Sequence, residues 1–238
     1  MTPRAIVPTG IRFENIDKRY GGLYALRRVS LDVAAGECVA LAGRNGSGKT
    51  TLLRIAAQLV RPSAGTVSFS LADGRSAQNG NGAIGKNAGF VAHATMVYDD
   101  LTAEENLLLF ARLQGIARPK ERVEELLREV GLIERRASLV RTFSRGMRQR
   151  ITIARALLHA PSVLLLDEPA TGLDSQGTAW LAATLRGMRD VGATIVMSLH
   201  GESVVSDVAT RAVRLEAGSV VADTAAGADR RAVLAAAE

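Results

Sequence analysis

The sequence has one cysteine, few aromatic residues and no long apolar run. Of its 238 residues, 4% are aromatic, and Cys38 is the single cysteine. Cys38 has no partner for an internal disulfide, and the apolar run around it predicts a buried strand position. The longest apolar stretches, such as Val163 to Leu166, fall far short of the ~20 residues that span a bilayer. The sequence therefore predicts neither a disulfide framework nor a membrane-spanning helix.

The chain also lacks internal repeats, long low-complexity linkers and an N-terminal apolar segment followed by a cleavage site. We therefore expect no signal peptide and a cytoplasmic protein. With 47% apolar residues over this length, one compact α/β domain or a core with a smaller lobe is expected.

The net charge of +6 comes from 30 Lys and Arg against 24 Asp and Glu. Between Arg112 and Arg155 stand twelve basic and five acidic residues, so this segment holds the whole surplus. The segment either faces a negative partner, such as nucleic acid or anionic lipid, or is a solvated helical face.

Strand and helix patterns alternate along the chain. A buried strand is expected from Glu37 to Ala42, followed by a glycine-rich turn and a helix from Lys49 to Leu59. Another strand is expected from Thr66 to Ser70. The Gly-, Asn- and Ser-rich stretch from Ala72 to Ala88 predicts a mobile hairpin tip.

Residues from about 93 to 145 look mostly helical. A capping box at Thr102 to Glu105 opens one helix, and Pro119 starts another that ends at Gly131. Further buried strands are expected at Ser162 to Leu166 and Thr194 to Ser198. The pattern predicts an α/β core with a helical insertion.

The glycine-rich turn fits a phosphate-binding loop: Gly43, Arg44, Asn45, Gly46, Ser47, Gly48, Lys49 and Thr50. Its glycines let backbone N–H groups close around phosphate oxygens at a helix N-terminus. Lys49 is expected to reach the β- and γ-phosphates, Thr50 to bind Mg²⁺, and Thr51 to belong to the same nucleotide-binding set. The alternative is an ordinary glycine-rich turn.

Two adjacent acids end the strand that precedes Pro169. Asp167 is placed to hold the Mg²⁺ shell, and Glu168 to orient and polarise an attacking water. The alternative is a solvated pair of acids at a strand end.

Further segments resemble the motifs of the ABC ATPase family in order and spacing, over roughly Ile11 to Val221. The segment Phe143 to Arg150 is similar to the family's signature sequence, Ala170 to Asp174 to its D-loop, and His200 to its switch histidine. Tyr20 resembles the aromatic residue that stacks on adenine.

The resemblance implies a P-loop NTPase (RecA-like) core with an N-terminal antiparallel β subdomain and an inserted helical subdomain. It implies a single domain over residues 1–238, with its core at 11–92 and 146–222, a helical subdomain at about 93–145 and a tail at 223–238. ATP and Mg²⁺ are the implied cofactors.

In this family two domains pair head to tail, and the signature of one faces the γ-phosphate bound by the other. That assigns Ser144, Gly146 and Asp174 to nucleotide binding across the pair, and His200 and Lys49 to catalysis beside Glu168. A lone histidine at a strand end, as at His200, is otherwise often structural. The resemblance implies a homodimer and transmembrane transporter subunits as partners, with the chain peripheral on the inner face of the membrane.

Two departures from the common family pattern stand out. Arg145 stands where the first signature glycine is usual, and Met147 where glutamine is usual. His93 takes the place of a glutamine that links the γ-phosphate and Mg²⁺ to the membrane subunits, so we count it with the metal site. His93, the segment Leu101 to Leu107 and the signature together resemble the haem-exporter ATPases of cytochrome c maturation and, more loosely, ABC-2-type export ATPases.

Two other function classes remain as alternatives. A soluble ABC ATPase acting on nucleic acid or an assembly complex is supported by the basic surplus alone, and we expect no nucleic-acid partner. A small-molecule kinase or GTPase would leave the signature segment unexplained. We also expect His159, at a helix end before Pro161, to cap helix carbonyls.

Overall fold

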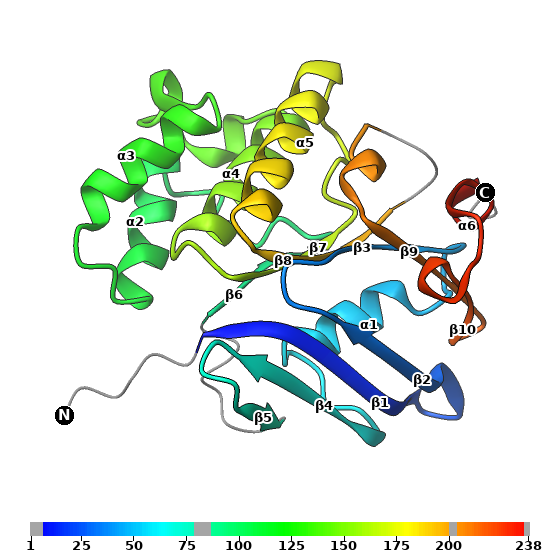
Figure 1. The fold of residues 1–238 in the computed structure, drawn as a ribbon. Coiled ribbons are helices and arrows are strands. Elements are labelled where there is room, and N and C mark those ends of the chain that lie inside the picture. The colour runs from blue at the N-terminus through cyan, green and yellow to red at the C-terminus, as the bar shows by residue number, and fades with distance from the viewer. Residues whose placement is uncertain (1–6, 79–86, 200–203, 236–238) are drawn as a thin grey trace.

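The computed structural model describes residues 7–78, 87–199 and 204–235. In these ranges no helix is both long and apolar enough to cross a membrane. The elements form two sheets with helices between and above them (Figure 1).

One sheet is antiparallel and lies at the N-terminal side of the molecule. Its strand order is β2-β1-β4-β5, with β1 at Pro8–Tyr20, β2 at Leu23–Val33, β4 at Ala64–Leu71 and β5 at Ser76–Gln78. Ile11, Phe13 and Ile16 of β1 are buried, because one face of the sheet packs on the core. The predicted N-terminal antiparallel β subdomain is confirmed.

The second sheet has six strands in the order β10-β9-β3-β8-β7-β6. Their bounds are β3 Cys38–Ala42, β6 Ala88–Val91, β7 Val163–Asp167, β8 Thr194–Ser198, β9 Arg211–Glu216 and β10 Ser219–Asp223. The strands pair in parallel except β10, which is antiparallel to β9. Every residue of β3, β7 and β8 is buried, as expected for a sheet covered on both faces.

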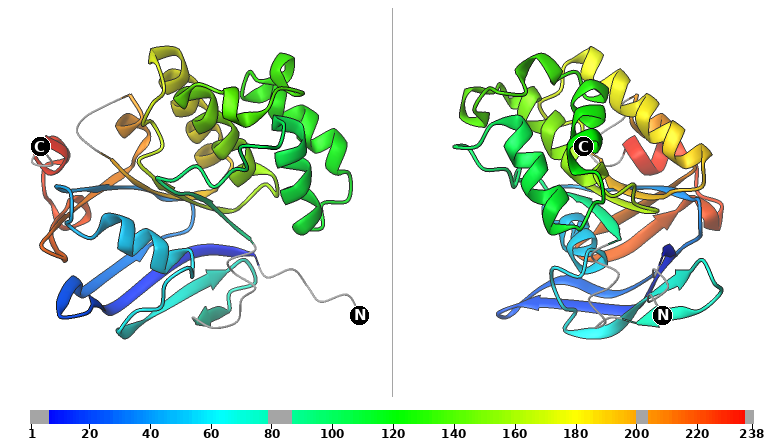
Figure 2. Two further views of the ribbon diagram at one scale, coloured as in Figure 1. Left: turned by 180° about the vertical axis from the view of Figure 1, so that it is seen from behind. Right: turned by 90° about the vertical axis from the view of Figure 1, so that its left-hand side faces the viewer.

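Helices cover both faces of this sheet. Helix α1 (Lys49–Ala56) lies between the two sheets, and α4 (Arg145–Leu157) and α5 (Ser175–Asp190) pack on the opposite face (Figures 1 and 2). Helices α2 (Ala103–Leu113) and α3 (Pro119–Glu129) lie on that same side and pack against α4. Side chains along β7 divide between two apolar clusters: Val163 and Leu165 pack on the α1 side, Leu164 and Leu166 on the helical side. This is the α/β P-loop NTPase architecture that the sequence predicts.

The helical insertion is more irregular than expected. Residues 92–101 form no helix or strand, and two short 3-10 turns at Ile133–Arg135 and Val140–Thr142 follow α3. The capping box is confirmed, since the Thr102 side chain accepts from the Glu105 N–H and Glu105 accepts from the Thr102 N–H. The predicted helix from Lys49 ends at Ala56, earlier than expected.

The expectation that His159 caps a helix end is wrong. Arg122 of α3 donates to the carbonyls of Leu157 and Leu158 at the end of α4, at 2.9 and 3.2 Å, and His159 bonds to neither. A long cation from a neighbouring helix has replaced the local cap.

The chain ends are also partly described. Helix α6 (Arg230–Ala235) falls in the predicted tail and packs on β9, with Val233 and Leu234 buried. Within the predicted hairpin tip, β5 is present, and residues 79–86 lie outside the described residues.

Candidate active site

The phosphate-binding loop follows β3 and leads into α1. A Cβ at Gly43 would collide with the Leu215 carbonyl, and one at Gly48 would come within 2.7 Å of the Ala25 carbonyl. Both have positive φ, 137° and 111°. The loop therefore needs glycine at these positions to pack against β2 and β9, and it delivers the N-terminus of α1 to a phosphate.

Lys49 begins α1 and is 6% exposed. Its ammonium donates to the carbonyls of Gly43 and Arg44. Burial lowers the pKa of Lys49, and the negative charges of Glu168 and Asp167 oppose that shift. The cation thus sits over the loop with both carboxylates near.

Thr50 and Asp167 bring the loop and β7 together. The Thr50 hydroxyl donates to Asp167 Oδ1 at 3.0 Å, while Asp167 Oδ2 is buried and has no hydrogen-bond partner among the described residues. Mg²⁺ in P-loop enzymes is held by such a hydroxyl and carboxylate, together with waters and substrate phosphates. The residues present therefore fit Mg²⁺.

Ser198 at the end of β8 ties the two acids together, and sequence reasoning missed it. Its hydroxyl donates to Asp167 Oδ1 at 2.8 Å and accepts from the Glu168 N–H at 2.9 Å. Glu168 has φ 49°, a conformation costly for a non-glycine residue and persistent only where its surroundings impose it. A serine closing an otherwise apolar strand was the available signal.

His93 lies beside Glu168. Its Nδ1 is 3.7 Å from Glu168 Oε2, and the Thr171 hydroxyl lies 3.4 Å from the same oxygen. No described group of three or more His, Cys, Asp or Glu residues is arranged to hold a metal ion. His93 is thus a neighbour of the Glu168 carboxylate, and both its assignment to the metal and the catalytic role of Glu168 stay predictions.

The signature segment opens helix α4. Ser144 is its N-cap and accepts from the Met147 N–H at 3.2 Å, as expected for a residue at a helix start. A Cβ on Gly146 would lie 3.0 Å from the Gly172 carbonyl, so the signature packs directly on the D-loop. Apart from the Met147 N–H, which donates to the Ser144 hydroxyl, the first-turn N–H groups of Arg145 and Gly146 point out of the helix start and are free of intrahelical partners, as an anion site requires.

The two departures from the common pattern meet in one cavity. His93 and Arg145 line a cavity of about 220 Å³ together with Arg148, Gln149, Asp167 and Glu168. The Arg145 stem lies against Gly172, where a Cβ would come within 2.7 Å of Arg145 Cγ. Arg145 is thus accommodated because the D-loop has a glycine opposite it.

Asp174 and Gln149 connect the D-loop to neighbouring helices. Asp174 caps α5 by accepting from the Gly177 N–H at 2.7 Å, and its carboxylate lies 3.7 Å from Arg150. Gln149 is buried and donates to the Pro169 carbonyl at 2.8 Å. Nothing in the sequence pattern marked Gln149, since it lies inside a helical stretch.

Tyr20 ends β1 and is 50% exposed. Lys18 lies 5.0 Å from the centre of its ring. By contrast, the guanidinium groups of Arg19 and Arg27 both lie over the Tyr24 ring, at 4.3 and 4.8 Å. Tyr20 is the more accessible of the two for stacking on a base. His200, the predicted switch histidine, lies outside the described residues.

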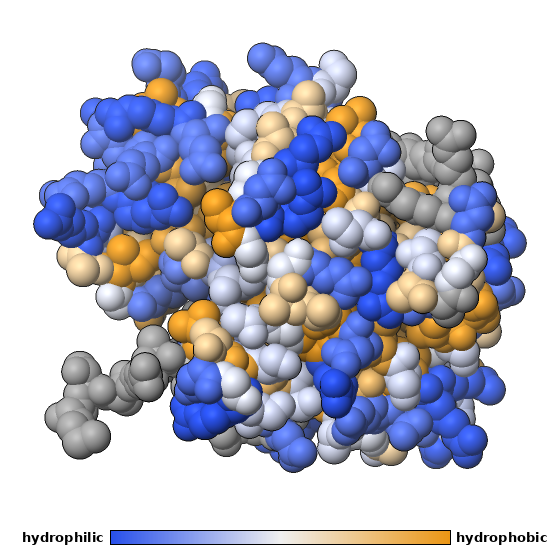
Figure 3. Space-filling view, in the orientation of Figure 1, coloured by the Kyte–Doolittle hydropathy of each residue, from blue (hydrophilic) through white to orange (hydrophobic). Residues whose placement is uncertain are grey.

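Half of the basic residues between Arg112 and Arg155 are ion-paired. Six of these twelve cations form ion pairs with acids: Arg118, Arg122, Arg128, Arg141, Arg148 and Arg150. Arg155 is half-buried and bonds to backbone carbonyls. Figure 3 shows the helical region covered mainly by hydrophilic residues. These ion pairs and the hydrophilic surface favour a solvated helical face for this segment.

Comparison with known proteins was made by sequence and by structure. Residues 26–171 match the family model described as ABC transporter. The Nod factor export ATP-binding protein I of Burkholderia orbicola is 36% identical over 217 residues, covering 90% of this chain and 70% of that protein. The sulfate/thiosulfate import ATP-binding protein CysA of Thermosynechococcus vestitus is 37% identical, covering 89% of this chain and 62% of CysA.

A solved structure has the same fold. The dimeric ATP-binding cassette MJ0796, in a post-hydrolysis state bound to ADP and Pi, superposes with a TM-score of 0.80 and 29% identity, covering 90% of this chain and 97% of that one. Members of the family use ATP with Mg²⁺, and their ATP-binding domains work in pairs with transmembrane subunits. On this evidence the chain belongs to the ABC transporter family, as an ATP-binding and ATP-hydrolysing subunit.

Proposed function

We propose that this chain powers export through separate transmembrane subunits, as one half of a head-to-tail pair on the inner face of the cell membrane. ATP hydrolysis by this chain is supported by the position of four residues at the carboxyl ends of β3 and β7: Lys49, Thr50, Asp167 and Glu168. These strand ends are where parallel α/β sheets bind their ligands.

In this proposal the chain's own residues divide the chemistry. The loop N–H groups and Lys49 bind the β- and γ-phosphates, and Thr50 and Asp167 would hold Mg²⁺, which would neutralise charge on the phosphates. Glu168 accepts a proton from the water that attacks the γ-phosphorus, and the bond from phosphorus to the β–γ bridging oxygen breaks, giving ADP and inorganic phosphate. Ser144 and Gly146 of the partner complete the γ-phosphate site, and Tyr20 stacks on adenine.

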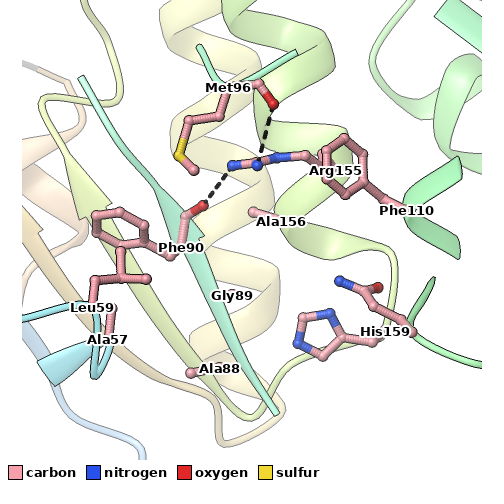
Figure 4. Close-up of a pocket in the computed structure, with 11 residues that line it drawn as sticks. Ala57, Leu59, Ala88, Gly89, Phe90, Met96, Phe110, Arg155, Ala156 and His159 are labelled. Atoms are coloured by element: carbon pink, nitrogen blue, oxygen red, sulfur yellow. Dashed lines mark hydrogen bonds between the residues drawn. The ribbon is translucent and has the colours of Figure 1, made fainter. Parts of the chain in front are cut away.

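A groove between the core and the helices is evidence for a binding site for a membrane subunit. It is a cavity of about 190 Å³ whose lining includes Leu59, Phe90, Met96, Phe110, Arg155 and His159 (Figure 4). Leu59 and Met96 are 57% and 50% exposed, and Tyr98 and Leu113 nearby on the chain are 55% and 74% exposed. Exposed apolar side chains beside a groove suit a helix of a transmembrane subunit.

The direction of transport rests on resemblance. The relatives reported above include an export protein and an import protein at similar identity, so identity alone does not favour export. The segment around His93, Leu101 to Leu107 and the signature favours it through likeness to export ATPases. Haem export is the finer form of this proposal, and it rests on the same likeness.

Co-purification tests the proposal. A tagged chain expressed with its native neighbouring genes should bring down a multi-helix membrane protein, and ATP hydrolysis should rise when that protein is reconstituted in lipid. Reading the neighbouring DNA for such a membrane protein gives the candidate. Recovery of nucleic acid in place of a membrane protein would favour the soluble ABC ATPase alternative.

Export is tested with inside-out vesicles that contain the complex. Substrate that accumulates inside them only with ATP and the intact Glu168 supports export, and haem can be the first substrate tried. Depletion from preloaded vesicles would contradict export while leaving the ATPase assignment intact.

A further inference from the structure

The loop that carries His93 is held from helix α4. We call residues Phe90–Met96 the His93 loop. Arg155 donates from Nη2 to the Phe90 carbonyl at 3.2 Å and from Nη1 to the Met96 carbonyl at 3.4 Å. Figure 4 shows the guanidinium between these two carbonyls, one at each end of the loop.

A second side chain of α4 holds the same loop. Thr152 is fully buried, and its hydroxyl lies 2.9 Å from the Thr95 carbonyl and 2.8 Å from the Arg148 carbonyl of its own helix. Thr152 and Arg155 are three residues apart and so share one face of α4. Three carbonyls of the His93 loop are therefore fastened to one helical turn.

Holding the His93 loop in this way lowers the stability of the fold. Among the described residues Arg155 has no carboxylate within ion-pair distance, its Nε is buried without a partner, and burial lowers its pKa. The Phe110 ring, 5.1 Å away, gives partial compensation. Met96 has φ 48°, a strained conformation for its residue type. A half-buried cation that is held by two carbonyls and a ring, without a carboxylate, is expected where the position of the loop matters more than stability, and so is a strained residue such as Met96.

The same helix also holds the loop that carries Glu168. Gln149, one turn before Thr152, donates to the Pro169 carbonyl directly after Glu168. The two loops meet where His93 Nδ1 lies 3.7 Å from Glu168 Oε2. One helix thus sets the spacing between His93 and the catalytic carboxylate.

We propose that Arg155 and Thr152 are positioning residues that hold His93 beside Glu168 through their contacts from α4. Their effect on partner-stimulated hydrolysis rests on the proposed function. The contacts that hold the His93 loop do not depend on the proposed function, because they lie within the isolated chain.

Hydrogen exchange of the isolated chain tests the fastening. Thr152→Val keeps the side-chain shape and removes the hydroxyl, and Arg155→Lys keeps the charge but replaces the planar guanidinium, which spans two carbonyls, with a single ammonium nitrogen. Peptides covering residues 90–98 should exchange about threefold faster or more in both variants. Thr152→Ser should restore the slow rate. Unchanged exchange in Thr152→Val and Arg155→Lys would overturn the proposal.

Arg122→Lys is the matched control. Arg122 also donates to two carbonyls at α4, those of Leu157 and Leu158, yet it does not touch the His93 loop. It should leave exchange over residues 90–98 unchanged. Equal acceleration in Arg122→Lys would show a general loosening of α4 and contradict a specific role for Arg155.

A double-mutant cycle with His93→Ala tests the positioning role. In the complex with the co-purified membrane subunits, Thr152→Val should cut partner-stimulated hydrolysis by about fivefold in the wild-type background and by less than about twofold in His93→Ala. Effects that multiply would show that Thr152 acts independently of His93. Absence of stimulation in wild type would instead count against the proposed function, with the exchange result still deciding the fastening.

Discussion

The candidate site residues at the strand ends of the core and those in the helical region are held in position by different kinds of contact. Asp167 ends a strand whose five residues are all buried and Glu168 follows it directly, while Lys49 and Thr50 start the helix that comes after β3 and its loop. His93 and Arg145 lie on a loop and at a helix start, fixed by contacts with residues distant in sequence. Local pattern places the first group, and tertiary packing places the second.

This difference explains why the departures from the family pattern occur where they do. In the phosphate-binding loop, a larger side chain would clash with neighbouring backbone, as a Cβ on Gly43 would with the Leu215 carbonyl. The cavity around Arg145 has room for a long side chain, because Gly172 lies opposite. The site can therefore vary at its helical wall while the strand ends stay fixed.

The largest expected effect is at the strand-end side. Lys49→Ala should weaken ATP binding by at least about a hundredfold, because the loop offers no second cation in this buried position. Isothermal titration with ATP and Mg²⁺ measures it, and Arg54→Ala, on the exposed side of the same helix, is the control. An unchanged affinity of Lys49→Ala for ATP would contradict the view that the strand-end residues cannot be replaced.

A smaller effect is expected at the contact between the signature and the D-loop. Gly172→Ala places a Cβ at φ 83° and within 2.7 Å of Arg145 Cγ. It should destabilise the chain by about 1–3 kcal/mol and lower hydrolysis. Adding Arg145→Ala should recover part of the loss, leaving the backbone strain. A thermal melt with activity measured in parallel checks both, and no recovery in the double variant would remove the packing explanation.

Substitutions of His93 are expected to affect partner-stimulated hydrolysis and basal hydrolysis differently. His93→Ala should leave ATP binding intact and reduce partner-stimulated hydrolysis more than basal hydrolysis, because the contact with Glu168 is needed chiefly on closure. His93→Gln should keep most of the stimulation, since an amide retains a donor and an acceptor. Hydrolysis rates with and without membrane subunits decide the matter. Equal stimulation in wild type and His93→Ala would end the coupling role.

The smallest effect concerns acid stability at the groove. Burial lowers the pKa of His159 below its ordinary value, so the unfolded chain takes up this proton at higher pH than the folded chain. The stability from neutral His159 is present above about pH 6.5 and falls as pH drops below it, by at most about 1.4 kcal/mol per unit. His159→Leu should reduce the fall in melting temperature between pH 7.5 and pH 5.5. The same fall in His159→Leu as in the wild type would contradict this.

The sequence allowed prediction of the strand ends because their signals are local. A buried apolar run, a glycine-rich turn and a capping residue each act within a few positions, as at Gly43, Lys49 and Thr102. Ser198, Gln149 and Arg155 could not be assigned roles in this way, because each acts on a residue twenty or more positions away. The wrong assignment of His159 has the same origin, since Arg122 reaches the helix end from another helix.

The most direct test of the account is the state of Glu168→Gln with ATP and Mg²⁺. An amide keeps the shape of Glu168 but cannot accept a proton from water, so the variant should bind ATP, hydrolyse it at least about a hundredfold more slowly and accumulate as a closed pair. Gel filtration with light scattering should show a dimer with ATP and Mg²⁺ and a monomer without nucleotide. A monomer at every ATP concentration, or wild-type turnover, would contradict a shared site built on Glu168.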